Sequence, residues 1–401
     1  LDWLPAAAVL PAGEALPIGD QLPILFWGDG STRAQFATLI SERVCQIHAD
    51  ILGAAVFMVS RWEETVSDSL DEHGRFPASA SAAWRHRFLD RPVIDEYALV
   101  LQAWLRCLLP GWQPEPRRFT VQLSHDIDGL RRFTPERGIW RPGGGLRALA
   151  REALNGRPLA QLRDTLRDIG YSRRHDPADS HFQAIGRLVD LARQYDFPAA
   201  FYFMTSEPGP RDDGYQLASS PGQAALARIR GAGHELGLHP GYTTFLDTAE
   251  LERQRERFAA ATGLTSYGGR QHYLRFRVPQ TWRDWADAGF RYDSTLGYAT
   301  APGFRAGTCL PFQPYDLAAD EPIDLIELPL IAMDVTFTSP TYLGLTPAQA
   351  EAQILELARR CQAVAGCFTL LWHNGTMEPP LDALYETILG RLRQLMDDSD
   401  E

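Results

Sequence analysis

The chain has 401 residues, of which 45% are hydrophobic and 22% are charged, as is typical of a globular protein with a full hydrophobic core. Its net charge of −12 argues against non-specific binding to nucleic acids, and no apolar run reaches the roughly 18 residues that a transmembrane helix needs. Lysine is absent, which excludes Schiff-base chemistry, a P-loop lysine and a Ser–Lys dyad.

The cysteines indicate the compartment. There are five, an odd number, and they are scattered without a CxxC pair. This usage favours a reducing compartment and argues against a disulfide framework or a cysteine zinc site.

Residues 1–20 carry no basic segment and are interrupted by prolines, so they make a poor signal peptide. We therefore expect a cytoplasmic protein without a membrane span.

The N-terminal part is expected to form a small α/β domain of unknown role, residues 1–116. The patterns predict strands at 23–31 and 54–64 and helices at 32–45 and 93–109. A proline-rich segment at 108–118 then predicts a linker.

From residue 117 to 401 the sequence alternates between short apolar strands and amphipathic helices. The predicted strands are 119–128, 198–206, 234–239, 267–276, 290–298, 325–331 and 366–373. The predicted helices are 180–195, 221–231, 248–262, 279–288, 347–364 and 380–397. This alternation predicts a distorted parallel (β/α) barrel of about seven strands, with its active site at the carboxyl ends of the strands.

Residues 129–178 interrupt the alternation. The segment is rich in arginine and glycine and is basic within an acidic protein. We interpret it as a solvated insertion with one or two helices. The functional alternative is a flap that meets an anionic substrate, such as a phosphorylated or nucleotide-linked sugar.

The stretch "SHDID" places two carboxylates at the end of the first strand of this second part. Asp126 and Asp128 are two residues apart, so they share one face of an extended chain, and His125 lies on the other. Two carboxylates at a barrel rim are unfavourable unless a cation or a proton donor lies between them. The pattern therefore predicts a metal with one carboxylate ligand and one free base.

Histidines mark the ends of three further strands. In "GHELGLHP" the spacing of His234 and His239 is five, which does not fit an HExxH zinc-protease helix. His239 at the strand end fits a metal ligand, and His234 on the opposite face fits a structural role. "RQHYLR" places Arg270 and His272 on one face. "LLWHN" presents His373 above a hydrophobic floor.

The order of these motifs resembles the polysaccharide deacetylase (NodB-homology, carbohydrate esterase family 4) superfamily, over residues 119–398. The resemblance implies a catalytic-base Asp and a metal-binding Asp in the first motif, a metal histidine in the second, an arginine in the third, an Asp in the fourth and Leu-x-His in the fifth. In that order these positions are Asp126, Asp128, His239, Arg270, Asp293, and Leu371 with His373. The N-terminal part looks like the uncharacterised domain that precedes such catalytic domains in a bacterial subgroup.

The second motif departs from this pattern. It should read His-x-x-x-His, but Thr243 occupies the second position, and threonine is a poor zinc ligand. His272 is the first candidate to complete the site and His125 is the second. If neither does so, metal binding is weak or lost.

The resemblance implies metal-dependent removal of an acetyl group from an N-acetylated sugar, with a divalent metal such as zinc held by Asp128, His239 and His272. Asp126 would act as the base, oriented by Arg270. His373 would protonate the leaving amine, itself oriented by Asp293 or a backbone carbonyl. Two alternatives stay open: an amide or ester hydrolase with a small non-glycan substrate, and a non-catalytic glycan-binding or assembly protein.

Overall fold

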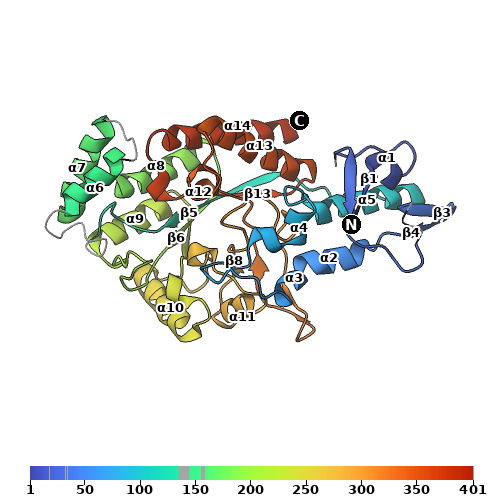
Figure 1. The fold of residues 1–401 in the computed structure, drawn as a ribbon, viewed down its shortest axis with the longest axis horizontal. Coiled ribbons are helices and arrows are strands. Elements are labelled where there is room, and N and C mark those ends of the chain that lie inside the picture. The colour runs from blue at the N-terminus through green and yellow to red at the C-terminus, as the bar shows by residue number, and fades with distance from the viewer. Residues whose placement is uncertain (18, 32, 34, 135–143, 155–158, 401) are drawn as a thin grey trace.

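The structure is a computed structural model of the whole chain, and it describes all residues except 18, 32, 34, 135–143, 155–158 and 401 (Figure 1). Helices pack around a central sheet in the larger, C-terminal part. A smaller N-terminal unit lies at one end of the molecule, and the helices of the 129–178 insertion lie at the other (Figure 1).

The central sheet has five parallel strands in the order β12-β13-β5-β6-β7. Their bounds are Ala332–Met333 for β12, Cys367–Leu371 for β13, Thr120–Ile127 for β5, Ala199–Phe203 for β6 and Glu235–Leu238 for β7. All five residues of β6 are buried, as expected for a strand that is covered on both faces. The parallel direction brings the carboxyl ends of the strands to a common edge, where the polar motifs lie.

The expected distorted barrel of about seven strands is confirmed only in part, because the described residues form a continuous parallel sheet of five strands. Beyond β7, strands β8 (Tyr292–Asp293) and β11 (Ile326–Glu327) form a separate parallel pair, joined to the sheet only by single bridges of Gly269 to Leu238 and Asp293. The predicted strand 267–276 fails because its backbone turns: Tyr273 and Leu274 have φ values of 63° and 50°, which β-structure does not allow. A Cβ atom at Gly269 would lie 2.0 Å from the carbonyl of Leu238, so only glycine permits this close approach.

The helices of the C-terminal part confirm the sequence prediction closely. They are α8 (Ser180–Gln194), α9 (Ser220–Gly231), α10 (Thr248–Thr262), α11 (Gln280–Asp287), α13 (Pro347–Ala363) and α14 (Leu381–Asp400), with a short α12 (Asp334–Thr338). Asp179 caps α8 by accepting a hydrogen bond from the backbone N–H of His181, and Thr346 forms a capping box with Gln349 at α13. These helices bury their apolar faces on the sheet in one continuous core.

The insertion carries two described helices, α6 (Gly144–Leu154) and α7 (Leu159–Arg174), which agrees with the prediction of one or two helices. Residues 135–143 and 155–158, which belong to the same prediction, lie outside the described residues. Within the insertion Arg132 pairs with Asp168 at 3.0 Å, and the same guanidinium ties the insertion to the body through Glu378 at 2.9 Å.

The N-terminal unit differs from its prediction. Its elements are β1 (Asp2–Pro5), α1 (Ala6–Val9), β2 (Gln21–Ile24), β3 (Ala37–Ser41), β4 (Val44–Ile47), α2 (Ile51–Val59), α3 (Trp62–Thr65), α4 (Ala82–Arg85) and α5 (Val93–Leu108). Residues 37–47 form a hairpin where a helix was expected, and 54–64 is mostly helical where a strand was expected. Asp50 starts α2 by accepting a hydrogen bond from Gly53, and Ala54 and Met58, four residues apart, bury one helical face.

The N-terminal unit packs on the C-terminal part through buried ion pairs. Glu64 pairs with Arg305 at 2.5 Å and with Arg61 at 2.8 Å, and Asp95 accepts hydrogen bonds from the hydroxyl of Thr308 and the backbone of Cys309. Arg305 therefore belongs to this interface. The domain boundary near 116 stays a prediction. Among the described residues, no helix combines the length and hydropathy needed to cross a membrane.

Candidate active site

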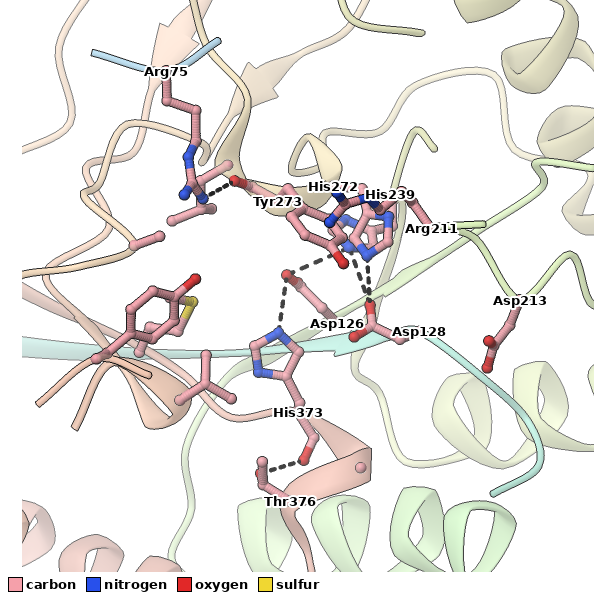
Figure 2. A pocket seen from close by; sticks show the side chains of 16 residues that line it. Arg75, Asp126, Asp128, Arg211, Asp213, His239, His272, Tyr273, His373 and Thr376 are labelled. Carbon is pink, nitrogen blue, oxygen red and sulfur yellow. Dashed lines mark hydrogen bonds and ion pairs between the residues drawn. The ribbon is translucent and has the colours of Figure 1, made fainter. Parts of the chain in front are cut away.

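A pocket of about 340 Å³ opens at the carboxyl ends of β5, β7 and β13 (Figure 2). It is lined by Arg75, Asp126, Asp128, Arg211, Asp213, His239, His272, Tyr273, Leu274, Ala299, Met333, Val335, Tyr342, His373, Gly375 and Thr376. Five of the seven residues that the sequence singled out as catalytic or metal-binding thus share one cavity, with His272 among them. Arg270 and Asp293 lie behind the wall.

Three side chains converge on one point of the pocket. The ligand atoms of Asp128, His239 and His272 all lie within 4.8 Å of one another. Asp128 Oδ1 is 3.3 Å from His239 Nε2 and 3.7 Å from His272 Nε2. Among the described residues, both His239 Nε2 and Asp128 Oδ1 are buried without a hydrogen-bond partner. Such orphaned atoms are rare in folded proteins, and two that face each other fit a bound cation.

Hydrogen bonds behind the two imidazoles fix which nitrogen faces the pocket. His239 Nδ1 donates to the backbone carbonyl of Arg270, and His272 Nδ1 donates to Asp212 Oδ1 at 2.7 Å. Asp212 is held in turn by the backbone N–H of Tyr242, at 3.0 Å and 3.1 Å from its two oxygens. In the neutral imidazoles this leaves each Nε2 lone pair free to bind a metal.

The two other histidines of the motifs lie elsewhere. His125 is fully buried, with Nδ1 2.8 Å from the carbonyl of Trp372 and its ring against Phe201. Burial lowers the pKa of His125 to about 4, so this imidazole is a neutral core group. His234 packs against the other side of Phe201, in agreement with its predicted structural role. Thr243 is exposed and does not line the pocket, whereas His272 does.

Asp126 is held by an arginine from the segment after β7. Its carboxylate accepts a hydrogen bond from Arg270 Nη1 at 2.9 Å, and its side chain is only 3% exposed. Arg270 is fixed by Ser294, whose carbonyl accepts from Nε at 2.8 Å and whose hydroxyl accepts from Nη2 at 2.9 Å. Its guanidinium also lies over the ring of Tyr202. The charge-assisted bond therefore fixes Asp126 in one orientation, with Oδ2 facing the pocket.

His373 faces Asp126 from the end of β13, with Nε2 4.0 Å from Asp126 Oδ2. Behind it, Nδ1 lies 2.7 Å from Asp334 Oδ1, and Asp334 also accepts from the backbone N–H of His373 and the hydroxyl of Thr376. Burial acts to lower the pKa of His373, but the charge and hydrogen bond of Asp334 outweigh it and raise the pKa to about 10. His373 is therefore an imidazolium at neutral pH.

The orienting residue of His373 was predicted incorrectly, because neither Asp293 nor a backbone carbonyl occupies that position. Asp293 is fully buried behind Arg270, where Oδ1 accepts from the backbone N–H of Thr295 at 2.9 Å. Burial raises the pKa of Asp293 to about 7, and burial together with the charge of Asp293 raises the pKa of Glu327 well above its usual range. Asp334 itself carries a sequence signal, since it directly follows the strand β12.

The comparisons with known proteins cover the chain unevenly. Residues 13–110 match the model of a family of unknown function, DUF7033. No curated protein sequence matches the chain. Among solved structures, the crystal structure of a putative polysaccharide deacetylase from Mycobacterium smegmatis is similar, with 17% sequence identity and a TM-score of 0.46. That similarity covers 73% of this chain and 93% of the other.

Proposed function

We propose that this protein is a metal-dependent hydrolase that removes the acetyl group from an N-acetylated sugar or polysaccharide precursor. The observation that carries the proposal is the convergence of Asp128, His239 and His272 beside Asp126 and His373 in one pocket. The order of the five motifs, which resembles the polysaccharide deacetylases, supports a sugar amide as the substrate.

The three converging residues fit a divalent cation such as zinc. One carboxylate and two imidazoles with free Nε2 atoms are typical zinc ligands, and three protein ligands leave further coordination positions open. Asp128 is available as an anionic ligand, since burial acts to raise its pKa but the hydrogen bond to His239 and the neighbouring histidines lower that pKa well below its usual range. A cation bound there would lower the pKa of water and polarise the acyl carbonyl.

Asp126 is the proposed general base. Its Oδ2 faces the same space as the metal-binding atoms, 3.7 Å from His239 Nε2, so it can take a proton from a water at that point. The other oxygen is engaged by Arg270, which keeps the carboxylate from rotating away. Arg270 is therefore a positioning residue, and Ser294 and Asp293 hold the wall in which it lies.

His373 is the proposed general acid. Its pKa of about 10 means that it carries a proton to give to the departing amine, and Nε2 faces Asp126 across the pocket. Leu274, Ala299, Met333 and Val335 form an apolar wall beside it, where the acyl methyl group can lie.

The position of His272 favours this reading over the non-catalytic glycan-binding alternative, which depended on the loss of a metal histidine. His272 faces Asp128 and His239 and has its own carboxylate partner, as metal-binding histidines in proteins commonly do. A small non-glycan amide or ester as substrate would use the same atoms, and a substrate panel separates the two.

The test measures bound metal by elemental analysis and acetate release from N-acetylglucosamine oligosaccharides, in the parent protein and in His239→Ala, His272→Ala and His86→Ala. His86 is exposed and outside the pocket, so its variant is the matched control. We expect near-stoichiometric metal in the parent and the control, and its loss together with activity in the other two. A parent protein that binds no metal after reloading contradicts the proposal. If the protein binds metal but hydrolyses only non-glycan amides, its substrate is a non-glycan amide and not a sugar.

A further inference from the structure

A loop of the N-terminal unit reaches the candidate active site. The backbone carbonyl of His73 accepts a hydrogen bond from Arg275 Nε at 2.8 Å, and the His73 ring packs edge-on against Tyr242 and Tyr273. The loop turns at Gly74, whose φ of +74° suits glycine. Arg75, the next residue, lines the pocket. The unit whose family has no known function thus forms part of the pocket wall.

Two nitrogens of the Arg75 guanidinium donate hydrogen bonds within the protein, and the third does not. Its side chain is 8% exposed, Nε donates to Asp71 at 2.7 Å and Nη1 donates to the carbonyl of Tyr273 at 2.7 Å. Among the described residues, the remaining amino group, Nη2, makes no hydrogen bond. Arg91 of the same unit provides a contrast, since its three guanidinium nitrogens all donate to Glu96 or to the carbonyl of Gln21. Arg91 has the bonding of a purely structural arginine, whereas Arg75 keeps a donor for the pocket.

A second arginine lies at the same pocket. Arg211 is exposed and its guanidinium lies 5.4 Å from the ring centres of both Tyr242 and Tyr273. Within the described part of the chain it has no ion pair with a carboxylate. Asp213 also lines the pocket, but Figure 2 shows it on the far side of the histidine cluster from Arg75. Two guanidinium groups, those of Arg75 and Arg211, therefore line the pocket of a protein whose net charge is −12.

The basic insertion does not supply this charge. None of its described residues lines the pocket, so the structure gives no support to the predicted flap over an anionic substrate. The pocket obtains its cations from Arg75 and Arg211 instead. Arginine presents paired donors to carboxylate and phosphate groups, and a desolvated guanidinium binds them more strongly than an exposed one.

We propose that the N-terminal unit is a substrate-recognition element, and that Arg75 binds a negatively charged group, a carboxylate or phosphate, carried by the sugar in the pocket. Arg211 adds attraction from the rim. This inference rests on the proposed function for the sugar itself, but the anion-binding role of Arg75 is independent of whether the acetyl group is hydrolysed.

The experiment measures binding by calorimetry with three probes: N-acetylglucosamine, its 1-phosphate and its 6-phosphate. The proteins are the parent, Arg75→Gln and Arg85→Gln, the last being an exposed arginine of the same unit outside the pocket. All three carry Asp126→Asn to prevent turnover. We expect a phosphorylated sugar to bind more tightly than the neutral one. Arg75→Gln should reduce that ratio of affinities about 10- to 100-fold, as loss of a charged hydrogen bond does, and Arg85→Gln should not.

Two results would overturn the inference. Equal affinity of the parent for neutral and phosphorylated sugars means that no anion site exists. Equal weakening of all probes in Arg75→Gln, with loss of bound metal, means that Arg75 only braces Tyr273 and His272. If binding of a phosphorylated sugar depends on Arg75 but the protein with Asp126 intact releases no acetate from any of the three sugars, the proposed function fails and this inference stands. If acetate release is equally efficient with charged and neutral sugars, the proposed function stands and this inference fails.

Discussion

Each side of the pocket contains a histidine that is hydrogen-bonded to an aspartate, but the two histidines face different groups. His272 and His373 each have Nδ1 2.7 Å from an aspartate oxygen, of Asp212 and Asp334 respectively. His272 faces another imidazole and Asp128, within 4.8 Å, whereas His373 faces the carboxylate Asp126 with no second imidazole in the described residues at that distance. His272 Nε2 therefore faces the residues that could hold a metal, whereas His373 Nε2 faces the carboxylate that could act as a base. This difference can be tested one residue at a time.

The largest expected effect separates Asp126 from Asp128, which are only two residues apart. Asp126→Asn should lower kcat by about 10²- to 10⁴-fold and leave the metal bound, because it removes the base but no ligand. Asp128→Asn should lose the metal and the activity together. Metal content and acetate release measured on the same preparations check both. If Asp126→Asn also loses the metal, Asp126 is a metal ligand, and the two sides of the pocket do not differ as proposed.

The second prediction concerns the partner of the metal-side imidazole. Asp212→Asn should weaken metal affinity about 10- to 100-fold, because the carboxylate fixes the ring of His272 and increases its basicity. Competition with a chelator measures this affinity. Asp324→Asn, at an exposed position outside the pocket, is the control and should change nothing. An unchanged affinity in Asp212→Asn would mean that His272 does not bind the metal.

The third prediction concerns the equivalent partner on the other side. Asp334→Asn removes the charge that raises the pKa of His373 to about 10, so that pKa should fall. The alkaline limb of the kcat profile should move to lower pH, with a loss at pH 8.5 of about 10-fold for each unit by which the pKa falls below that pH. The metal should stay bound. Asp293→Asn, which removes the residue that the sequence had suggested for this role, should leave the limb in place.

Groups at strand ends were predictable from the sequence because the spacing of two along a strand fixes a shared face. Asp126 and Asp128 followed this rule, whereas Arg270 lies behind the pocket wall and His272 lines the pocket, because their segment turns and does not form a strand. The partners behind the histidines did not follow from it. Asp334 precedes His373 by 39 residues and Asp212 precedes His272 by 60, so only the packing of the strands brings them together.

The N-terminal unit was predicted less well for a local reason. The apolar run at 54–64 is short and hydrophobic on most sides, and such a run fits a buried strand or a buried helix equally. The cap at Asp50 was the signal that decides between them. The contribution of Arg75 to the pocket had no local signal, since its partner Tyr273 lies 198 residues away in the sequence.

The smallest expected effect is on stability, and it again distinguishes the His373 side. The folded metal-free protein keeps a proton on His373 up to about pH 10, while the unfolded chain loses it near pH 6.5. The unfolded state thus binds fewer protons between these values, and the free energy of unfolding should fall as pH rises, by up to about 1.4 kcal/mol per pH unit. Denaturant titrations of the metal-free protein from pH 7 to pH 9 measure the slope. Asp334→Asn should make this slope smaller, because without that carboxylate the pKa of His373 in the folded protein lies closer to its value in the unfolded chain. An equal slope in the two proteins would show that the carboxylate of Asp334 does not hold the proton on His373.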